Sequence, residues 1–123
     1  MKKILALLLG LLGLASNASA QSDSIKTVDA TQFEEIIRSD SVVLVDVRTA
    51  EEYANGHIDN ALNIDVLKPD FECKAVTLSK SKNIAVYCRS GKRSLKAAAM
   101  LAKSGYHVIN LRGGWIEWQE YKK

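Results

Sequence analysis

Apolar and polar residues follow two different patterns along this chain, one typical of buried strands and the other of amphipathic helices. The apolar runs within 42–45 and 83–87 are continuous, as in the central strands of parallel sheets. Less continuous apolar segments at 61–64 and 106–111 predict two further strands. Four strands are therefore predicted, and helical patterns lie between them.

Amphipathic helical patterns separate and flank the predicted strands. Capping-box spacing at 31–34 and 49–52 predicts that two helices begin at Thr31 and Thr49. Residues 21–26 are polar and are expected to form a loose lead-in. This order predicts an α/β fold with a central parallel sheet of about four to five strands and helices on both faces. The predicted helices cover residues 31–37, 49–55, 71–76, 94–103 and 115 onward.

The first twenty residues have the pattern of a cleavable signal peptide. Lys2 and Lys3 precede an apolar run at 4–14, and small residues at 18–20 form a cleavage site. The alternative is a membrane anchor, but the apolar run is well short of the ~20 residues that a spanning helix needs. We therefore expect cleavage after Ala20, a single mature domain without a membrane segment, and a periplasmic or secreted location.

Composition and charge exclude several classes of protein. The formal net charge is +3, and Lys2 and Lys3 of the leader supply part of it. A mature chain so close to neutrality is not expected to bind nucleic acid through bulk charge. Two cysteines are too few for a disulfide scaffold. No metal-ligand cluster or glycine-rich dinucleotide fingerprint is present, so we predict no metal and no organic cofactor.

The candidate chemistry lies in the polar segment that follows the predicted strand 83–87. A cysteine at the carboxyl end of a buried strand, before a loop that opens a helix, lies where backbone N–H groups stabilise a thiolate and a bound anion. Cys88 is therefore the predicted nucleophile. The residues predicted to bind substrate are Arg89, Ser90, Gly91, Lys92, Arg93 and Ser94.

Within this loop, the backbone amides are expected to matter more than any one side chain. Gly91 lets the loop curl without a Cβ atom near the sulfur. Arg89 and Arg93 are the two cations that we expect to contact an anion, and solvated surface charge is the alternative. Ser90 and Ser94 can donate hydroxyl hydrogen bonds, although Ser94 is alternatively the N-cap of the next helix.

Four motifs in this order resemble those of single-domain rhodaneses. Each motif is weak alone, but together they cover essentially the whole mature chain. With its leader, the chain most resembles the small exported rhodaneses of bacterial envelopes. The motifs are Val45-Asp46-Val47-Arg48, then Glu51-Glu52-Tyr53 with Gly56-His57-Ile58, then Cys88-Arg89-Ser90-Gly91-Lys92-Arg93-Ser94, and finally Leu111-Arg112-Gly113-Gly114-Trp115.

The resemblance implies a sulfurtransferase that works through covalent catalysis. Cys88 would take a sulfane sulfur from a small anionic donor such as thiosulfate and become a persulfide. The persulfide would pass that sulfur to cyanide or a thiol, including a thiol carried by a protein. We expect the protein to act as a monomer.

Three alternatives belong to other classes. Cysteine phosphatases of a related fold have a loop motif in which five residues separate the cysteine from an arginine. In this chain that position is Ser94, and Arg93 comes one residue too early. A noncatalytic binding module would be expected to lack Cys88. An envelope redox protein would use Cys73 as a resolving thiol, yet the two cysteines lack Cys-x-x-Cys spacing. The structural alternative for Cys73 is a half-buried apolar side chain.

Several other conspicuous residues are expected to be structural. The carboxylate of Asp46 is expected to bind neighbouring backbone N–H groups. His57 has no second ligand at metal spacing, so a hydrogen-bonded role is favoured. Trp115 and Trp118 are expected to pack against the sheet. Residues 59–60 replace the Pro-Gly that usually follows Gly-His-Ile in the family, and they are still expected to form a turn.

Overall fold

A five-stranded parallel sheet organises residues 24–123, the part of the chain that the computed structural model describes. The strand order is β2-β6-β5-β3-β4, and every neighbouring pair is parallel. The predicted α/β fold is confirmed, while the signal-peptide prediction lies outside the described residues. The strands are β2 Ile25–Val28, β3 Val42–Asp46, β4 Leu62–Asn63, β5 Asn83–Tyr87 and β6 Val108–Leu111.

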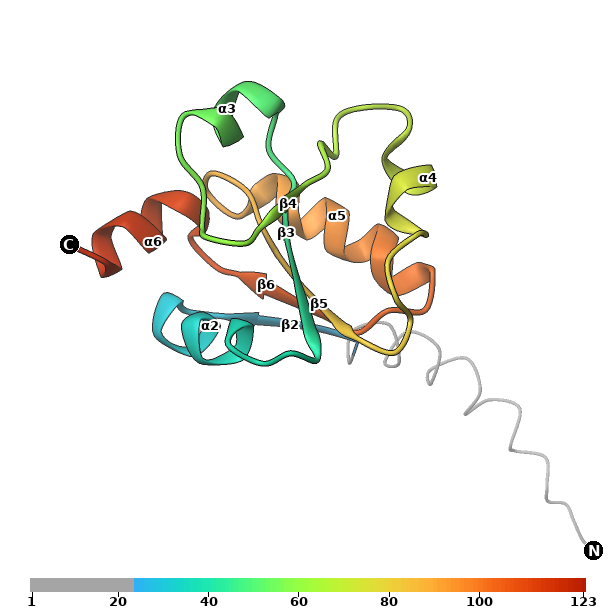
Figure 1. Ribbon diagram of the computed structural model, residues 1–123, viewed down its shortest axis with the longest axis horizontal. Coiled ribbons are helices and arrows are strands. Elements are labelled where there is room, and N and C mark those ends of the chain that lie inside the picture. Colours follow the sequence, from blue (N-terminus) through green and yellow to red (C-terminus); the bar gives the residue numbers. More distant parts are fainter. Residues whose placement is uncertain (1–23) are drawn as a thin grey trace, which may run out of the picture.

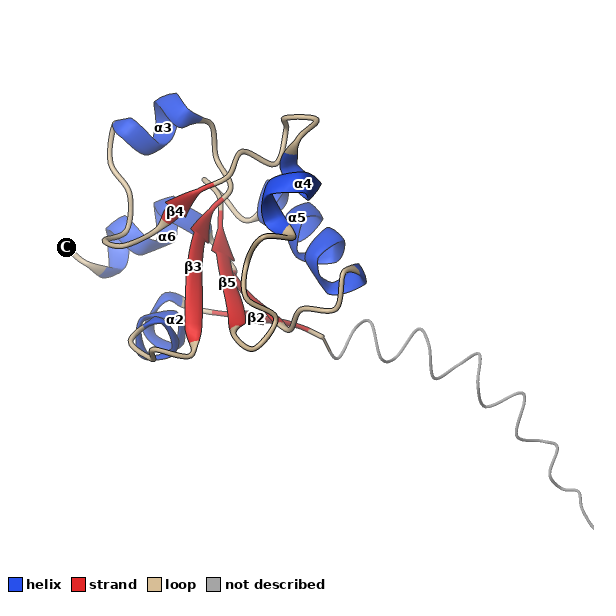
Figure 2. Cartoon of the chain, turned by 45° about the vertical axis from the view of Figure 1, so that its right-hand side comes forward, coloured by secondary structure: helices blue, strands red, loops and turns tan. Residues whose placement is uncertain are grey.

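Helices cover both faces of this sheet, with α2 and α6 on one side and α4 and α5 on the other (Figures 1 and 2). The short helix α3 follows β3 directly and lies at the carboxyl end of the sheet, at the top of Figure 1. No helix in residues 24–123 is long and apolar enough to cross a membrane. The helices are α2 Ala30–Ile37, α3 Ala50–Ala54, α4 Phe71–Ala75, α5 Lys92–Lys103 and α6 Gly114–Tyr121.

The central strand β5 shows why a continuous apolar run suits this position. Successive side chains of a strand point to opposite faces, so a strand covered on both faces needs apolar residues throughout. Ile84 and Val86 pack in the core beneath α5, whereas Ala85 and Tyr87 pack in the core beneath α2 and α6. The next residue along, Cys88, continues the alternation toward α5.

Two helix starts test the capping-box predictions. At Thr49 the box is present: the Thr49 hydroxyl accepts from the Glu52 amide, and the Glu52 carboxylate accepts from the Thr49 amide. The start predicted at Thr31 is wrong. The N-cap is Asp29, whose carboxylate accepts from the amide of Gln32 at 2.9 Å, so α2 begins at Ala30.

The amino-terminal edge of the sheet corrects a second prediction. Residues 25 and 26 are not a loose lead-in but the start of β2, which pairs in register with β6 from Ile25–Val108 to Val28–Leu111. An edge strand is paired on one side only, and the two exposed residues in its middle interrupt the apolar pattern. β6 itself begins at Val108, two residues later than predicted.

Candidate active site

The Cys88 loop lies at the carboxyl end of the central strand, between the segments that follow β3 and β6. Because all three strands are parallel, their carboxyl ends meet at one edge of the sheet, where ligand sites of open α/β sheets form. The amides of Trp115 and Ile116, at the start of α6, donate to the carbonyls of Cys88 at 2.8 Å and Arg89 at 3.1 Å. The first turn of α6 therefore supports the loop from the β6 side.

The sulfur of Cys88 lies inside a cradle of hydrogen-bonding groups. The Gly91 amide donates to Sγ at 3.1 Å, and the thiol lies 3.5 Å from the Ser94 hydroxyl, to which it donates. Burial is the largest single influence on the thiol and raises its pKa. The hydrogen bond with the Ser94 hydroxyl and those from the amides of Ser94, Gly91 and Ser90 together outweigh burial, so the pKa of Cys88 lies below its ordinary value. The cradle thus favours the thiolate, which is the nucleophilic form.

Gly91 is required in this loop for two reasons. Its φ angle of +102° lies in the region that residues with a Cβ atom rarely adopt. A Cβ atom here would lie 2.1 Å from the carbonyl oxygen of Arg112, well inside contact distance. Gly91 therefore lets its amide face the sulfur while the loop packs against the turn that follows β6.

The side chains of the predicted substrate-binding residues differ in how deeply they are buried. Ser94 is buried and donates to the Gly91 carbonyl at 3.1 Å, and it is not an N-cap, because α5 begins at Lys92 with Gly91 before it. Arg89, Ser90 and Lys92 are exposed, on the solvent side of the loop.

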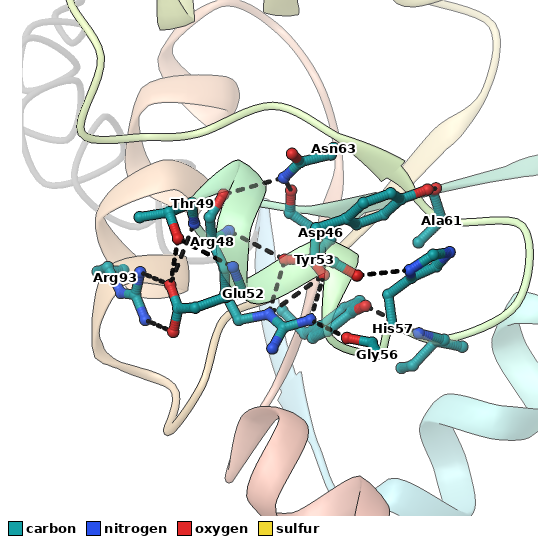
Figure 3. Close-up of polar contacts among 12 residues, drawn as sticks. Asp46, Arg48, Thr49, Glu52, Tyr53, Gly56, His57, Ala61, Asn63 and Arg93 are labelled. Atoms are coloured by element: carbon teal, nitrogen blue, oxygen red, sulfur yellow. Dashed lines mark hydrogen bonds and ion pairs between the residues drawn. The ribbon is translucent and has the colours of Figure 1, made fainter.

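Arg93 has a partner that the sequence did not reveal. Its Nη1 and Nη2 atoms donate to the two carboxylate oxygens of Glu52 at 2.7 and 2.9 Å, so the guanidinium is engaged by α3 (Figure 3). Glu52 and Arg93 lie 41 positions apart, and only the capping role of Glu52 could be recognised from local spacing. Acid and base types alone could not have signalled the pair.

The wall on the β3 side is built around a buried ion pair. Asp46 and Arg48 are 0% and 3% exposed, and the Nη2 atom of Arg48 donates to Asp46 at 2.7 Å and to the Gly56 carbonyl at 2.7 Å (Figure 3). Asp46 also accepts from the Arg48 amide at 2.9 Å, which confirms its structural role. The Arg48 guanidinium lies 5.6 Å from the ring centre of Tyr87 and 5.1 Å from that of Trp115.

His57 and the turn after it also have structural roles. The Nδ1 atom of His57 lies 2.8 Å from the Tyr53 carbonyl, and the two rings stack with centres 3.6 Å apart (Figure 3). Residues 59–60 form a turn, as expected, and Asn60 has a φ angle of +71°, in the left-handed region that asparagine adopts more readily than most residues. Within residues 24–123 no group of three His, Cys, Asp or Glu side chains is placed to hold a metal.

The two cysteines are free thiols in very different surroundings. Cys88 is only 1% exposed, whereas Cys73 on α4 is exposed, so the expectation of a half-buried Cys73 is wrong.

On α6, Trp118 is buried edge-on against Phe33 with ring centres 6.4 Å apart, and Trp115 stacks on Tyr87. Both tryptophans therefore pack in the core on this face of the sheet, as expected.

Comparison with known proteins agrees with this architecture. The family model described as a rhodanese-like domain matches residues 29–121. A protein of Allochromatium vinosum named "Sulfurtransferase" is 41% identical over 85 residues, which span 68% of this chain and 77% of that protein. "Thiosulfate sulfurtransferase 18" of Arabidopsis thaliana is 31% identical over 118 residues, which span 85% and 86% of the two chains.

A solved structure gives the same result for the fold. The crystal structure of a rhodanese-related protein from Thermoplasma volcanium aligns with a TM-score of 0.70 at 29% identity, covering 78% of this chain and 92% of that one. The resemblance seen in the four sequence motifs is thus confirmed by the family match and by the fold. The chain belongs to the rhodanese-like domain family.

Proposed function

We propose that this protein transfers sulfane sulfur through a persulfide on Cys88. The observation that carries the proposal is the cradle around Sγ, in which the Gly91 amide lies 3.1 Å from the sulfur and the hydrogen-bonding groups lower the thiol pKa. The family membership and the relatives named as sulfurtransferases support the same reaction class. The proposed donor is a small anion such as thiosulfate.

The proposed reaction has two displacements. The Cys88 thiolate attacks the outer sulfur of thiosulfate, the S–S bond of the donor breaks, and sulfite leaves with the electron pair. Cyanide or an acceptor thiolate then attacks the outer sulfur of the persulfide. The new bond forms as the Cys88 thiolate leaves, which restores the free enzyme. One difficult transfer is thereby divided into two easier ones.

The cradle amides can serve both steps. A thiolate is the starting nucleophile of the first step and the leaving group of the second, so groups that stabilise negative charge on Sγ assist its release. The exposed cations Arg89 and Lys92 stand on the loop side from which a donor anion would arrive.

The test compares the two cysteines. In the protein carrying Cys88→Ser, thiosulfate:cyanide sulfur transfer should fall to background, whereas Cys73→Ser should leave it near the wild-type rate. Mass spectrometry after thiosulfate treatment should show one added sulfur on the peptide that contains Cys88. Full activity in Cys88→Ser would contradict the proposal, and an inert but folded wild type would favour the noncatalytic alternative.

The proposal includes export, a monomeric state and a thiol acceptor in the bacterial envelope or outside the cell. The leader pattern of residues 1–20 supports export. N-terminal sequencing of the protein purified from the periplasm should begin at Gln21. Recovery of the chain only from the cytoplasm, with the leader retained, would contradict this part.

A further inference from the structure

The ion pair between Glu52 and Arg93 links α3 to the first turn of α5 (Figure 3). Its two hydrogen bonds, of 2.7 and 2.9 Å, use both Nη atoms of Arg93 and both carboxylate oxygens. The side chains of Arg93 and Glu52 are 25% and 28% exposed, so the pair is half-buried and solvent reaches it. The hydrogen bond from Arg93 is the main reason that the pKa of Glu52 is lowered to about 2, so Glu52 is charged at neutral pH.

Arg93 is also adjacent in the chain to a residue of the cradle. It precedes Ser94, whose hydroxyl lies 3.5 Å from Sγ. The hydrogen bond to Glu52 is the main cause that raises the pKa of Arg93, and the charges of Glu52, Cys88 and Asp65 raise it further. A charge on the sulfur thus adds to the effect of Glu52 in keeping the guanidinium protonated.

We propose that Glu52 is a positioning residue whose carboxylate competes with the anionic sulfur donor for the guanidinium of Arg93. This inference rests on the proposed function. A guanidinium fork binds a carboxylate or another oxyanion in the same bidentate way. Since Glu52 takes one N–H of each Nη atom, donor oxygens that bind the same edge of the guanidinium have to displace the carboxylate.

The carboxylate of Glu52 has partners other than Arg93. Oε1 of Glu52 also accepts from the Thr49 amide at 3.1 Å and from the Thr49 hydroxyl at 3.2 Å. Those bonds belong to the capping box of α3 and keep the carboxylate in place when Arg93 turns to a donor. After sulfite leaves, Glu52 recaptures the guanidinium, so the pair resets the site between turnovers.

The test removes the charge of Glu52 while preserving the helix cap. Glu52→Gln is suitable because glutamine also completes a capping box. We expect the KM for thiosulfate to fall about three- to tenfold, as for loss of a half-exposed competing ion pair, with a smaller change in kcat. Glu51→Gln is the matched control, since Glu51 is an exposed carboxylate on the same helix, and its KM should equal that of the wild type.

A second readout does not depend on sulfur transfer. In a Cys73→Ser background, iodoacetamide modifies Cys88 alone, and sodium sulfate serves as an inert anion that should protect it. Glu52→Gln should lower the sulfate concentration needed for half-protection about three- to tenfold, relative to sodium chloride of equal ionic strength. Anion protection without sulfur transfer would refute the proposed function while still supporting the competition.

The role of Arg93 is tested by a double variant. If Glu52 acts through the guanidinium, then Glu52→Gln should change neither KM nor sulfate protection in a chain that carries Arg93→Gln. A KM in Glu52→Gln that equals or exceeds that of Glu51→Gln would overturn the inference, as would an undiminished effect in the double variant. Should Glu52→Gln fail to melt cooperatively, Arg93→Gln decides: competition requires a higher KM for thiosulfate, and an unchanged KM refutes it.

Discussion

At the scale of single residues, the chemistry of Cys88 is set by groups close to it in the chain. The hydrogen bonds that lower its pKa come from Ser90, Gly91 and Ser94, all within six positions. Burial acts in the opposite direction, and the hydrogen bonds exceed it. A nucleophile of this kind depends on loop conformation more than on a distant charged partner.

The pH dependence of Cys88 modification follows from this arrangement. A lowered pKa means that the thiolate persists at lower pH and is lost only as the pH falls through that value. In a Cys73→Ser background, the midpoint of iodoacetamide modification should therefore lie below the value of ~8.5 for free cysteine. Ser94→Ala removes a stabilising hydroxyl and should move the midpoint upward, with modification several-fold slower at neutral pH. A midpoint above that of free cysteine would contradict the cradle.

At the scale of elements, the β5–α5 loop and the β6–α6 turn depend on each other. Gly91 approaches the Arg112 carbonyl, and Gly114, with a φ angle of +61°, approaches the carbonyls of Cys88 and Arg89. A Cβ atom at Gly114 would lie 2.5 Å from the first of these carbonyl oxygens. The two connections therefore pack backbone against backbone, which side chains at these positions would prevent.

Gly91→Ala should damage both stability and activity. The strained φ angle and the contact with Arg112 predict a loss of roughly 2–4 kcal/mol in the free energy of unfolding. Gly105→Ala is the matched control, because Gly105 has a similar φ angle of +99° but a Cβ atom added there would meet no atom within 4 Å. It should lose only about 1–2 kcal/mol and keep full activity. Urea unfolding and transfer assays distinguish the two, and equal losses would show that the close contact is unimportant.

The same scale shows what local sequence patterns can predict. The capping box at Thr49 is local, as are the strand, loop and helix around Cys88. The sequence predicts all of them, although α5 begins at Lys92, two residues before the predicted start. The pair of Glu52 and Arg93 joins residues 41 positions apart, so only the folded chain brings it together. The start of α2 was misplaced because Asp29 and Thr31 both have the chemistry of an N-cap, and tertiary contacts favour Asp29. The amide of Ala30, the residue that follows Asp29, donates to the Glu117 carboxylate of α6 at 2.8 Å.

At the scale of the whole molecule, Arg48 joins parts of the chain that the sheet alone does not hold together. It pairs with Asp46 on β3, binds the Gly56 carbonyl after α3, and lies against the ring of Trp115 on α6. A buried charge with such partners fixes the arrangement of three elements around the candidate active site.

The sequence does not predict the edge strand β2, because that strand has one strand neighbour and two exposed residues.

Removing Asp46 should therefore destabilise the entire domain. Asp46→Ala leaves the Arg48 guanidinium buried without its carboxylate, and breaking a buried pair costs about 3–5 kcal/mol. Asp70→Ala is the control, since its pair with Lys74 is 52% and 62% exposed and should contribute no more than about 1 kcal/mol. Thermal melting of both variants beside the wild type measures the difference. A mild effect of Asp46→Ala would show that solvent reaches Arg48.

The near-complete enclosure of Cys88 has a consequence for the size of its reaction partners. On the proposed mechanism the free thiol, 1% exposed, would admit only a compact donor, and bulky oxidants or reagents would meet exposed Cys73 first. A persulfide carries its reactive atom outward by one S–S bond of about 2 Å. On the proposed mechanism, an acceptor too large to reach the bare thiol would therefore still reach the outer sulfur of the persulfide, so bound sulfur would widen the range of acceptors.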